Sequence, residues 1–550
     1  MIKEQKFSQQ IRTLIDELKS VCANYGLGND GNEFKIITQV FLYKFLHDKF
    51  VYEVKHLDKK LKDASNWEEQ IASYSKDEFE MLTLKLSEDT AVIKSEQLIT
   101  SLFARQNEGN FADIFDKTLL DIARENNDIF SVFTGGGEKV ALFENLSKYV
   151  SDDRDDFCKA IINKLVGFSF ENIFNEGFDF FSSIFEYLIK DYNSDSGGKY
   201  AEYFTPHSVS AIMAKCLVSD KEKGSISNVS CYDPSAGSGT LLMNLAHQIG
   251  EDKCTIYSQD ISQKSSNLLR LNLILNKLVH SIHNVAQANT LIKPVHKDKS
   301  GRLKTFNYVV ANPPFKLDFS DFRDELDKRE NSDRFFAGIP KEPPKKKESM
   351  AIYLAFLQHI IFSLKPEGKA AVVVPTGFIT ASSGIDKKIR QKLIDDKMLR
   401  GVVSMPSNIF ATTGTNVSIL FIDKTNKEKV VLIDASKLGT KIKYGKKQKT
   451  LLDAKDEAKI INNFNKKIAI DDFSVVVKYE EIQAKNYSLS AGQYFELKVE
   501  YVDITQNQFK EILNTHQENI KDLLERSKEI DSEITKSLEG LEFNDDEERR

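Results

Sequence analysis

The feature that most constrains this chain is a regular alternation of short apolar strands and helices between residues 166 and 425. Helical stretches such as "SSNLLRLNLILNKL" and "AIYLAFLQHIIFSL" separate most of the strand candidates. Strands that alternate with helices form doubly wound, mostly parallel sheets, so the expected fold class is α/β. Ligands of such sheets bind at the carboxyl ends of the strands. The strand candidates are residues 228–233, 254–260, 306–312, 369–375, 399–406 and 417–423.

Helical segments flank this region on both sides. Residues 1 to 165 carry apolar side chains at three- and four-residue spacing, which predicts amphipathic helices whose Phe and Leu side chains form a core. The stretch "TGGGEK" at 134–139 is predicted as a loop, because it lacks the Lys-Ser or Lys-Thr of a phosphate-binding loop. We therefore expect an N-terminal helical domain over 1–165, a central domain over 166–488 with its core at 195–425, and a C-terminal helical tail over 489–550.

A long helix is predicted for the C-terminal tail. Its apolar positions alternate at four and three residues up to Ile534, a heptad pattern that includes His516 and Ser527 as polar members. A single apolar seam with charged flanks needs a surface to cover it. The N-terminal helices of the same chain and a partner subunit are both candidates, and the solvated character of the terminal "EFNDDEERR" favours the partner. This C-terminal seam comprises Phe509, Leu513, His516, Ile520, Leu523, Ser527, Ile530, Ile534 and Leu538.

The segment "YDPSAGSGTLL" joins a predicted strand to a predicted helix. Asp233 ends the strand, and Gly237 and Gly239 allow a sharp turn and a close approach of the backbone to a ligand. The dinucleotide-binding fingerprint requires a third glycine where this chain has Leu242, so the binding of an NAD-like pyrophosphate is not supported. The turn suits a ligand without phosphates, such as a nucleoside that carries an amino-acid tail.

Two further strand ends bring polar groups to the same edge of the sheet. Asp260 ends the next strand, where a carboxylate can accept hydrogen bonds from both hydroxyls of a ribose, and the adjacent Ile261 can flank an adenine ring. Taken alone, Asp260 fits a helix N-cap equally well, and the glycine turn beside it favours the ribose role. Asn289, at the end of "HNVAQAN", can hydrogen-bond the edge of an adenine.

The strand at 306–312 ends in the stretch "NPPF". Proline has no N–H and a fixed φ, so this tip is stiff and its carbonyl oxygens have no competing ladder bonds. Asn312 Oδ1 and the Pro313 carbonyl can together accept both hydrogens of a planar exocyclic amine such as N6 of adenine. Two acceptors free the nitrogen lone pair for attack on an electrophilic methyl group, Phe315 can stack on the base, and no metal is needed. A base in a duplex must be flipped out to reach such a pocket.

The order of these motifs resembles that of the N6-adenine DNA methyltransferases. The segment "GGKYAEYFTPHSVSAIMA" at 197–214 precedes the glycine turn, and "SQDIS", "ANTL" and "VVANPPF" follow it. The segments "DRFFAGIP", "AFLQHIIFSLKPEGKAAVVVPTGFI" and "MPSNIFATTGTNVSILFI" extend the similarity, over residues 170–425, to the modification (M) subunits of type I restriction–modification systems. The resemblance implies a Rossmann-like methyltransferase fold, S-adenosylmethionine as the cofactor and double-stranded DNA as the substrate.

The resemblance also implies roles for individual residues. Thr205 would lie near the methionine end of the cofactor, and Phe410 is a weaker candidate for a second wall against the base. The sequence departs from the family at Asn289, where related enzymes often carry Asp, and at Ser235, where Ala or Thr is frequent. The implied cofactor-binding residues are Glu202, Tyr203, Phe204, Thr205, Pro206, His207, Asp233, Ser235, Ala236, Gly237, Gly239, Asp260, Ile261 and Asn289, and the implied catalytic residues are Asn312, Pro313, Pro314 and Phe315.

Composition limits what else the chain can do. A net charge of −6 is unusual for a stand-alone DNA-binding protein, so a local basic face or a partner must supply part of the grip on DNA. The five scattered cysteines form no CxxC pair, and no metal site is predicted. No apolar run is long enough to span a membrane and the N-terminus has no signal-like segment, so a cytoplasmic location is expected.

The resemblance implies that other subunits complete the enzyme. After the central sheet the sequence offers a Lys-rich stretch at 437–449 and one long helix, with no domain large enough to read a DNA sequence and no Walker motif. A specificity (S) subunit would read the DNA and recruit two M subunits, with the C-terminal seam as the contact, and a restriction (R) subunit can join them.

Two alternatives to a DNA methyltransferase remain open at this point. One is a methyltransferase that acts on protein glutamine or on RNA, since NPP-aromatic tips serve any planar amine. The other is a non-catalytic assembly scaffold that binds S-adenosylmethionine as a sensor, and the intact "NPPF" argues against it.

Overall fold

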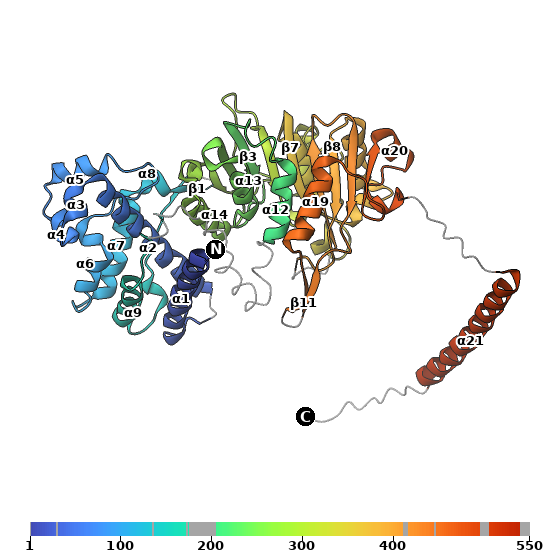
Figure 1. Cartoon of the computed structure of the whole chain (residues 1–550), viewed down its shortest axis with the longest axis horizontal. Helices are drawn as coiled ribbons and strands as arrows, with labels where there is room; N and C mark the ends of the chain where they lie inside the picture. The colour runs from blue at the N-terminus through green and yellow to red at the C-terminus, as the bar shows by residue number, and fades with distance from the viewer. Residues whose placement is uncertain are drawn as a thin grey trace. The chain divides into compact units, whose positions relative to one another are not determined.

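The chain forms two compact units, Met1–Phe495 and Glu496–Arg550, in this computed structural model (Figure 1). The structure describes residues 2–28, 31–134, 137–171, 174, 205–410, 416–444, 447–495 and 505–539. Among these residues, no helix is both long and apolar enough to cross a membrane. The domain boundaries expected after residues 165 and 488 stay predictions, and the division between compact units lies after Phe495.

The first unit is built on an eleven-stranded sheet with the order β13-β10-β8-β9-β7-β6-β3-β4-β5-β1-β2. Its central pairs, from β5 through β4, β3 and β6 to β7, are all parallel. β9 runs antiparallel to both of its neighbours, and β10 is antiparallel to β13. The strands are β1 (Val132–Thr134), β2 (Lys139–Val140), β3 (Val229–Asp233), β4 (Cys254–Asp260), β5 (Val285–Gln287), β6 (Phe306–Ala311), β7 (Leu364–Pro375), β8 (Leu399–Ser404), β9 (Val417–Asp423), β10 (Lys429–Asp434) and β13 (Ser474–Lys478). This mixed, mostly parallel sheet confirms the expected α/β class.

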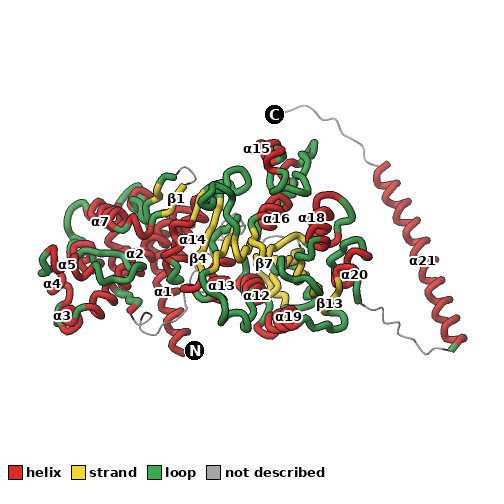
Figure 2. Tube along the Cα trace, turned by 90° about the horizontal axis from the view of Figure 1, so that it is seen from above, coloured by secondary structure: helices red, strands yellow, loops and turns green. Residues whose placement is uncertain are grey.

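Helices cover both faces of the sheet because consecutive strand residues point to opposite sides. Cys231 belongs to the core on one face and the adjacent Tyr232 to the core on the other. Figure 2 shows α12, α13 and α19 on one side of the strands and α16 and α18 on the other. The covering helices are α12 (His207–Leu217), α13 (Thr240–Ile249), α14 (Gln263–Leu275), α16 (Tyr353–Phe362), α17 (Gly377–Thr380), α18 (Gly384–Asp395), α19 (Ala454–Lys466) and α20 (Tyr479–Ala484), and α15 (Ser320–Leu326) lies before α16.

The N-terminal helices share a continuous core with one face of the sheet. The buried Arg270 of α14 links the two parts, since its Nη1 donates to the carbonyl oxygens of Val140 at 3.0 Å and Phe130 at 3.5 Å. These helices are α1 (Ile2–Asn24), α2 (Gly31–Leu57), α3 (Lys59–Asp63), α4 (Trp67–Ala72), α5 (Lys76–Thr83), α6 (Ile99–Ala104), α7 (Phe111–Glu125), α8 (Asn127–Phe130) and α9 (Arg154–Val166).

All six strand candidates are present, and the structure adds strands that the sequence patterns did not indicate. The wholly helical interpretation of residues 1–165 is wrong at the hairpin β1–β2, which extends the sheet through a parallel pair with β5. Strands of two or three residues are too short to display an alternating pattern, which explains why β1, β2 and β5 were missed. The Lys-rich region after residue 426 contains β10, β13 and a separate hairpin of β11 (Thr440–Tyr444) and β12 (Lys447–Leu451).

The second unit contains one long helix, α21 (Gln506–Glu539), as the sequence predicts. None of its described side chains is buried, and the apolar positions of the C-terminal seam are between 44% and 67% exposed. Exposed Leu and Ile side chains along one stripe are the usual mark of an interaction surface.

Gly239 yields the first testable prediction, because its backbone and its surroundings both exclude a side chain. It caps α13 with φ +83°, and an added Cβ would lie 2.2 Å from Leu269 Cδ1 of α14. Gly239→Ala should therefore lower the free energy of unfolding by about 2–4 kcal/mol, the sum of backbone strain and overpacking.

Gly301 provides a matched control, with φ +81° and no atom within 4 Å of an added Cβ. Gly301→Ala should lower the free energy of unfolding by the backbone strain alone, about 1 kcal/mol. Urea titrations of the two variants and of the wild-type chain measure both losses. Equal losses in the two variants would contradict the packing role of Gly239.

Candidate functional site

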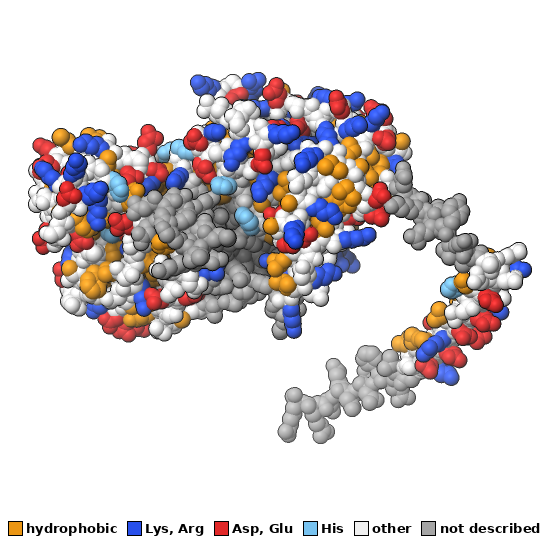
Figure 3. Space-filling model, in the orientation of Figure 1, with side chains coloured by type: hydrophobic (Ala, Val, Ile, Leu, Met, Phe, Trp, Pro, Cys, Tyr) orange, Lys and Arg blue, Asp and Glu red, His pale blue; other side chains and the backbone are white. Residues whose placement is uncertain are grey.

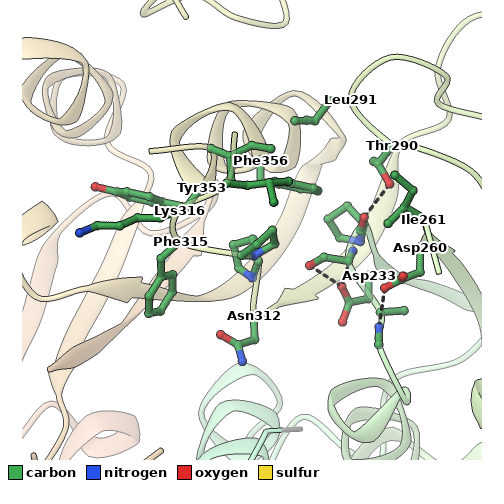
Figure 4. Close-up of a pocket in the computed structure, with 18 of the residues that line it drawn as sticks. Asp233, Asp260, Ile261, Thr290, Leu291, Asn312, Phe315, Lys316, Tyr353 and Phe356 are labelled. Carbon is green, nitrogen blue, oxygen red and sulfur yellow. Dashed lines mark hydrogen bonds between the residues drawn. The ribbon is translucent and has the colours of Figure 1, made fainter. Parts of the chain in front are cut away.

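A cavity of about 850 Å³ opens at the carboxyl ends of β3, β4 and β6 (Figure 4). The chain runs from β3 towards β5 on one side and from β6 towards β7 on the other, so the sheet order reverses between β3 and β6. This is the switch point at which doubly wound sheets bind ligands. The cavity continues beyond the sheet to a group of aromatic residues that includes Phe315, Tyr353 and Phe378.

Most of the predicted site residues line this one cavity. They are Thr205, Asp233, Ser235, Ala236, Gly237, Asp260, Ile261, Asn289, Asn312, Pro313, Pro314 and Phe315, together with Phe410. Pro206 and His207 do not line it and instead begin α12, and Gly239 packs on α14 as described above. Glu202, Tyr203 and Phe204 lie outside the described residues.

Two strand-end carboxylates fix the glycine turn. Asp233 Oδ1 accepts the Ser235 N–H at 2.9 Å, and Asp260 Oδ2 accepts the Gly237 N–H at 2.9 Å. The other oxygen of Asp260 accepts the Ser262 N–H at 2.8 Å, and Ser262 itself is the N-cap of α14. The helix-capping alternative for Asp260 is therefore wrong, because Ser262 does the capping. The Ser265 side chain is a third hydrogen-bond donor to this carboxylate, and the lone-pair capacity that remains can accept a hydrogen bond from a ligand.

Burial changes the acidity of both carboxyls. Asp233 is only 1% exposed, and its burial together with the nearby Asp260 raises its pKa to about 8. Burial also raises the pKa of Asp260, against the stabilising N–H groups of Ser262 and Gly237. The ionised forms of two buried, neighbouring carboxyls become more favourable once a cation or several hydrogen-bond donors bind beside them.

The loop after β5 is held in place from two directions. Thr290 Oγ1 donates to the Pro234 carbonyl at 2.6 Å, which ties the loop to the glycine turn. The buried Arg334 donates to the carbonyl oxygens of Leu291 at 2.7 Å and Thr290 at 2.9 Å. Its Nε donates to His359 Nδ1 at 3.0 Å, and burial together with the Arg334 charge holds the pKa of His359 well below its usual value. His359 is therefore neutral, and Arg334 holds the loop through these hydrogen bonds, with no carboxylate partner among the residues that the structure describes.

Asn289 is oriented by its own backbone. Its Oδ1 accepts the Leu291 N–H at 3.0 Å and the Ile292 N–H at 3.4 Å, so this oxygen already has two partners. The Nδ2 group at the edge of the cavity is the part of this amide that remains to contact a ligand. The sequence alone did not indicate this orientation.

At the tip of β6, Asn312 Nδ2 donates to Thr205 Oγ1 at 3.3 Å. Thr205 is 6% exposed and immediately precedes Pro206, the N-cap of α12, so a buried hydroxyl fixes which way the amide faces. Figure 4 shows Asn312 and Phe315 projecting from the same loop towards the same side. The contact joins two motifs that lie 107 residues apart in the sequence.

An aromatic slot adjoins the Asn312 tip. Phe315 packs edge-on against Tyr353, with ring centroids 6.3 Å apart and planes at 75°, and Tyr353 packs in the same way on Phe378. The Tyr353 hydroxyl donates to Asp386 Oδ1 at 2.6 Å, which locks its ring. Phe410 lines the same cavity from another loop. Sequence reasoning missed Tyr353, Phe378 and Asp386, because they come from α16, α17 and α18, and no local motif marks them.

The fold is that of Rossmann-like methyltransferases, and the chain belongs to the N-6 DNA methylase family, whose sequence profile matches residues 176–502, more than half of the chain. It is 27% identical to the type I restriction enzyme MpnII methylase subunit of Mycoplasma pneumoniae over 401 residues, which cover 71% of this chain and 70% of that protein. It is 25% identical to the HindI methylase subunit of Haemophilus influenzae over 380 residues, which cover 66% of this chain and 79% of that protein.

Among solved structures, the chain is similar to the methyltransferase subunit of the type I restriction-modification system from Streptococcus thermophilus. The TM-score is 0.68 at 22% identity, and the match covers 90% of this chain and 100% of that one. This likeness confirms the fold. Together with the family and the relatives, it confirms the expected resemblance to modification subunits.

The raised pKa of Asp233 yields a prediction about stability and pH. A carboxyl whose pKa is about 8 when folded and 3.8 otherwise binds its proton more tightly in the folded state. The protonated Asp233 carboxyl therefore contributes stability that is fully present below pH 4, and this contribution is lost as the pH rises towards 8. Across pH 5 to 9, the free energy of unfolding should fall more steeply for the wild-type chain than for Asp233→Asn.

Asp318 supplies the control for this measurement. It is exposed, and its hydrogen bonds from Ser320 lower its pKa, so it stays ionised throughout the same range. Asp318→Asn should follow the wild-type slope in urea titrations at each pH. If the difference in the free energy of unfolding between the wild-type chain and Asp233→Asn does not change with pH, Asp233 has an ordinary pKa and the prediction is wrong.

Proposed function

We propose that this chain transfers a methyl group from S-adenosylmethionine to N6 of an adenine flipped out of double-stranded DNA. The observation that carries the proposal is the single cavity that joins the glycine turn to the Asn312 tip. A methyl donor and an acceptor base must meet within one water-poor space, and each end of this cavity has the chemistry for one of them.

The residues of the glycine turn fit S-adenosylmethionine. The remaining acceptor capacity of Asp260 suits a ribose hydroxyl, Ile261 can flank the adenine ring, and Asn289 Nδ2 can donate to a ring nitrogen. Asp233 suits the ammonium group of the methionine tail, because a bound cation would favour the ionised carboxylate and offset the raised pKa. When bound, the cofactor supplies an electrophilic methyl group.

The "NPPF" tip acts on the acceptor base. Asn312 Oδ1 and the Pro313 carbonyl oxygen accept no hydrogen bond from the described residues, so both are available to the two hydrogens of an exocyclic amine. Thr205 holds the opposite side of the amide and thereby keeps Oδ1 turned towards the base. Phe315 and Phe410 offer aromatic faces for stacking, which compensates for the stacking that a base loses when it leaves the duplex.

The partner subunits belong to the same proposal. We infer that a specificity subunit reads the DNA sequence and binds two copies of this chain through the C-terminal seam, and that a restriction subunit can join the complex. The apolar positions of α21 are exposed, as expected for a helix that awaits a partner.

Asn312→Ala should abolish methylation while leaving the affinity for the cofactor unchanged. The substitution removes the acceptor that prepares the amine for attack, and losses of roughly 100- to 1000-fold are typical when one such group is deleted. Thr205→Val retains the acceptor but not its orientation, so we expect an intermediate rate. Transfer of labelled methyl to duplex DNA, in the presence of the specificity subunit, measures both effects.

The same assay separates the alternatives. Label that appears in RNA or in protein, with none in DNA, would support the rival methyltransferase. Unchanged methylation of DNA by Asn312→Ala would contradict the proposed mechanism. Loss of cofactor binding in the same variant would instead indicate a damaged fold.

Deletion of residues 505–550 should break assembly with the specificity subunit and leave the affinity for the cofactor intact. The deletion removes α21 but none of the residues that line the cavity. A milder pair of variants makes the test sharper. Ile520→Gln with Leu523→Gln alters the C-terminal seam, and Glu518→Gln with Glu525→Gln alters another face of the same helix.

Only the seam pair should fail to co-purify with the specificity subunit. Retention of the subunit by the truncated chain, or equal losses for both pairs, would refute the assignment of the seam.

A further inference from the structure

The strands β11 and β12 form a small antiparallel sheet outside the main one, which we call the basic hairpin (residues 440–451). Figure 1 shows β11 projecting from the lower edge of the first unit, below α19. The register pairs Lys441 with Thr450 and Lys443 with Gln448. Side chains directly opposite in an antiparallel pair share a face, so one face of the ribbon carries only these four polar residues.

The charge of this segment is opposite to that of the chain. Residues 437–450 contain six lysines and no acidic residue, whereas the whole chain has a net charge of −6. Lys437, Lys441 and Lys443 are exposed, and none of them forms an ion pair within the described part of the chain. Blue side chains lie along the described part of this projection in Figure 3. Like charges on a narrow ribbon repel one another, so these lysines do not serve the stability of the hairpin itself.

The base of the hairpin is hydrogen-bonded to the segment that leads to Phe410, a residue that lines the cavity. The Thr450 N–H donates to the Asn408 carbonyl at 3.0 Å, and Thr450 Oγ1 donates to the Ser407 carbonyl at 2.6 Å. Phe410 follows two residues later and lines the cavity. At the other strand, Gly439 has φ +86°, and an added Cβ would lie 2.7 Å from Thr450 Cγ2. The projecting lysines and the wall beside the base are therefore parts of one connected structure.

We propose that the basic hairpin grips the phosphate backbone of duplex DNA next to the base that enters the cavity. The inference rests on the proposed function, because it assumes that DNA is the substrate. A base in the aromatic slot leaves its flanking phosphates at the rim of the cavity, and phosphates at high density attract clustered lysines. A two-stranded ribbon also has dimensions that a DNA groove admits.

The residue types indicate a contact that carries no sequence information. Lysine is a point charge that suits phosphate, whereas arginine is the side chain that reads guanine edges with two parallel bonds. Residues 437–450 contain no arginine. The hairpin therefore positions the DNA and leaves the reading of its sequence to another part of the complex. An acidic surface on a partner protein is the competing occupant, and the experiment below distinguishes it.

The test compares two double variants of the full chain in its native complex. Lys441→Gln with Lys443→Gln removes two charges from the basic hairpin. Lys59→Gln with Lys62→Gln removes two exposed charges from α3, which lies at the far end of the N-terminal helices (Figure 1). The affinity for a short fluorescent duplex is measured between about 50 and 200 mM salt.

We expect the hairpin pair to flatten the plot of log affinity against log salt by about 1.8, because each phosphate contact contributes about 0.9. Affinity at about 100 mM salt should fall at least tenfold on the same basis. The KM for DNA should rise, while the methylation rate at saturating DNA and the affinity for the cofactor stay unchanged. The α3 pair should behave as wild type.

Equal salt slopes for the two pairs would overturn the inference, and DNA methylation by the wild-type complex would still support the proposed function. Loss of a co-purifying subunit at an unchanged slope would assign the basic hairpin to a protein contact, which also overturns it. A flattened slope in a complex that methylates no DNA would uphold the DNA grip and refute the proposed function.

Discussion

The hydrogen bond from the Gly237 N–H to the Asp260 carboxylate is the contact on which the rest of the site depends. It joins the turn after β3 to the end of β4 and thereby sets how closely the backbone approaches a ligand. Burial of this carboxylate disfavours its charge and raises its pKa, while the hydrogen bond from Gly237 favours the ionised form. Asp233, only 1% exposed on the other side of the turn, is disfavoured as an anion for the same reason, and its pKa also rises. Hydrogen-bond donors or a positive charge beside these two carboxyls would favour their ionised forms.

The second constraint is the reversal of strand order between β3 and β6. Because the chain departs in opposite directions from these neighbouring strands, the turn after β3 and the tip after β6 face one cavity rather than two. The bond between Asn312 and Thr205 uses this proximity, since the hydroxyl that orients the amide enters from the start of α12. The stiff Pro-Pro backbone and the buried Thr205 hydroxyl each restrict Asn312, so its amide is held in one orientation, as the proposed mechanism requires.

The sequence indicated the parts of this arrangement that have a local signature. Six apolar strands, the glycine turn and the "NPPF" tip are continuous in the chain, and their residues line the cavity where strand ends were expected. β7 starts at Leu364, earlier than predicted, because a Pro and a Gly at its beginning hide the strand. Arg334, His359 and Asp386 escaped notice because their importance lies in tertiary contacts, which no spacing reveals. Gly239 matched a ligand-binding motif but packs closely against Leu269 and does not line the cavity, since the same left-handed turn can serve packing or binding.

An acidic chain that acts on a polyanion must concentrate its few favourable charges where they are effective. At moderate salt, charges farther away than about 10 Å are largely screened, so the net charge of −6 opposes DNA binding less than its magnitude suggests. The exposed Lys441 and Lys443 lie on a short ribbon that is hydrogen-bonded to the segment preceding Phe410, a residue that lines the cavity. The remaining affinity and all sequence discrimination can then come from a second protein held by α21. On the two proposals made above, the exposed seam of that helix and the basic hairpin would have complementary roles: the hairpin would contribute affinity for DNA, and the seam would bind the partner that selects the site.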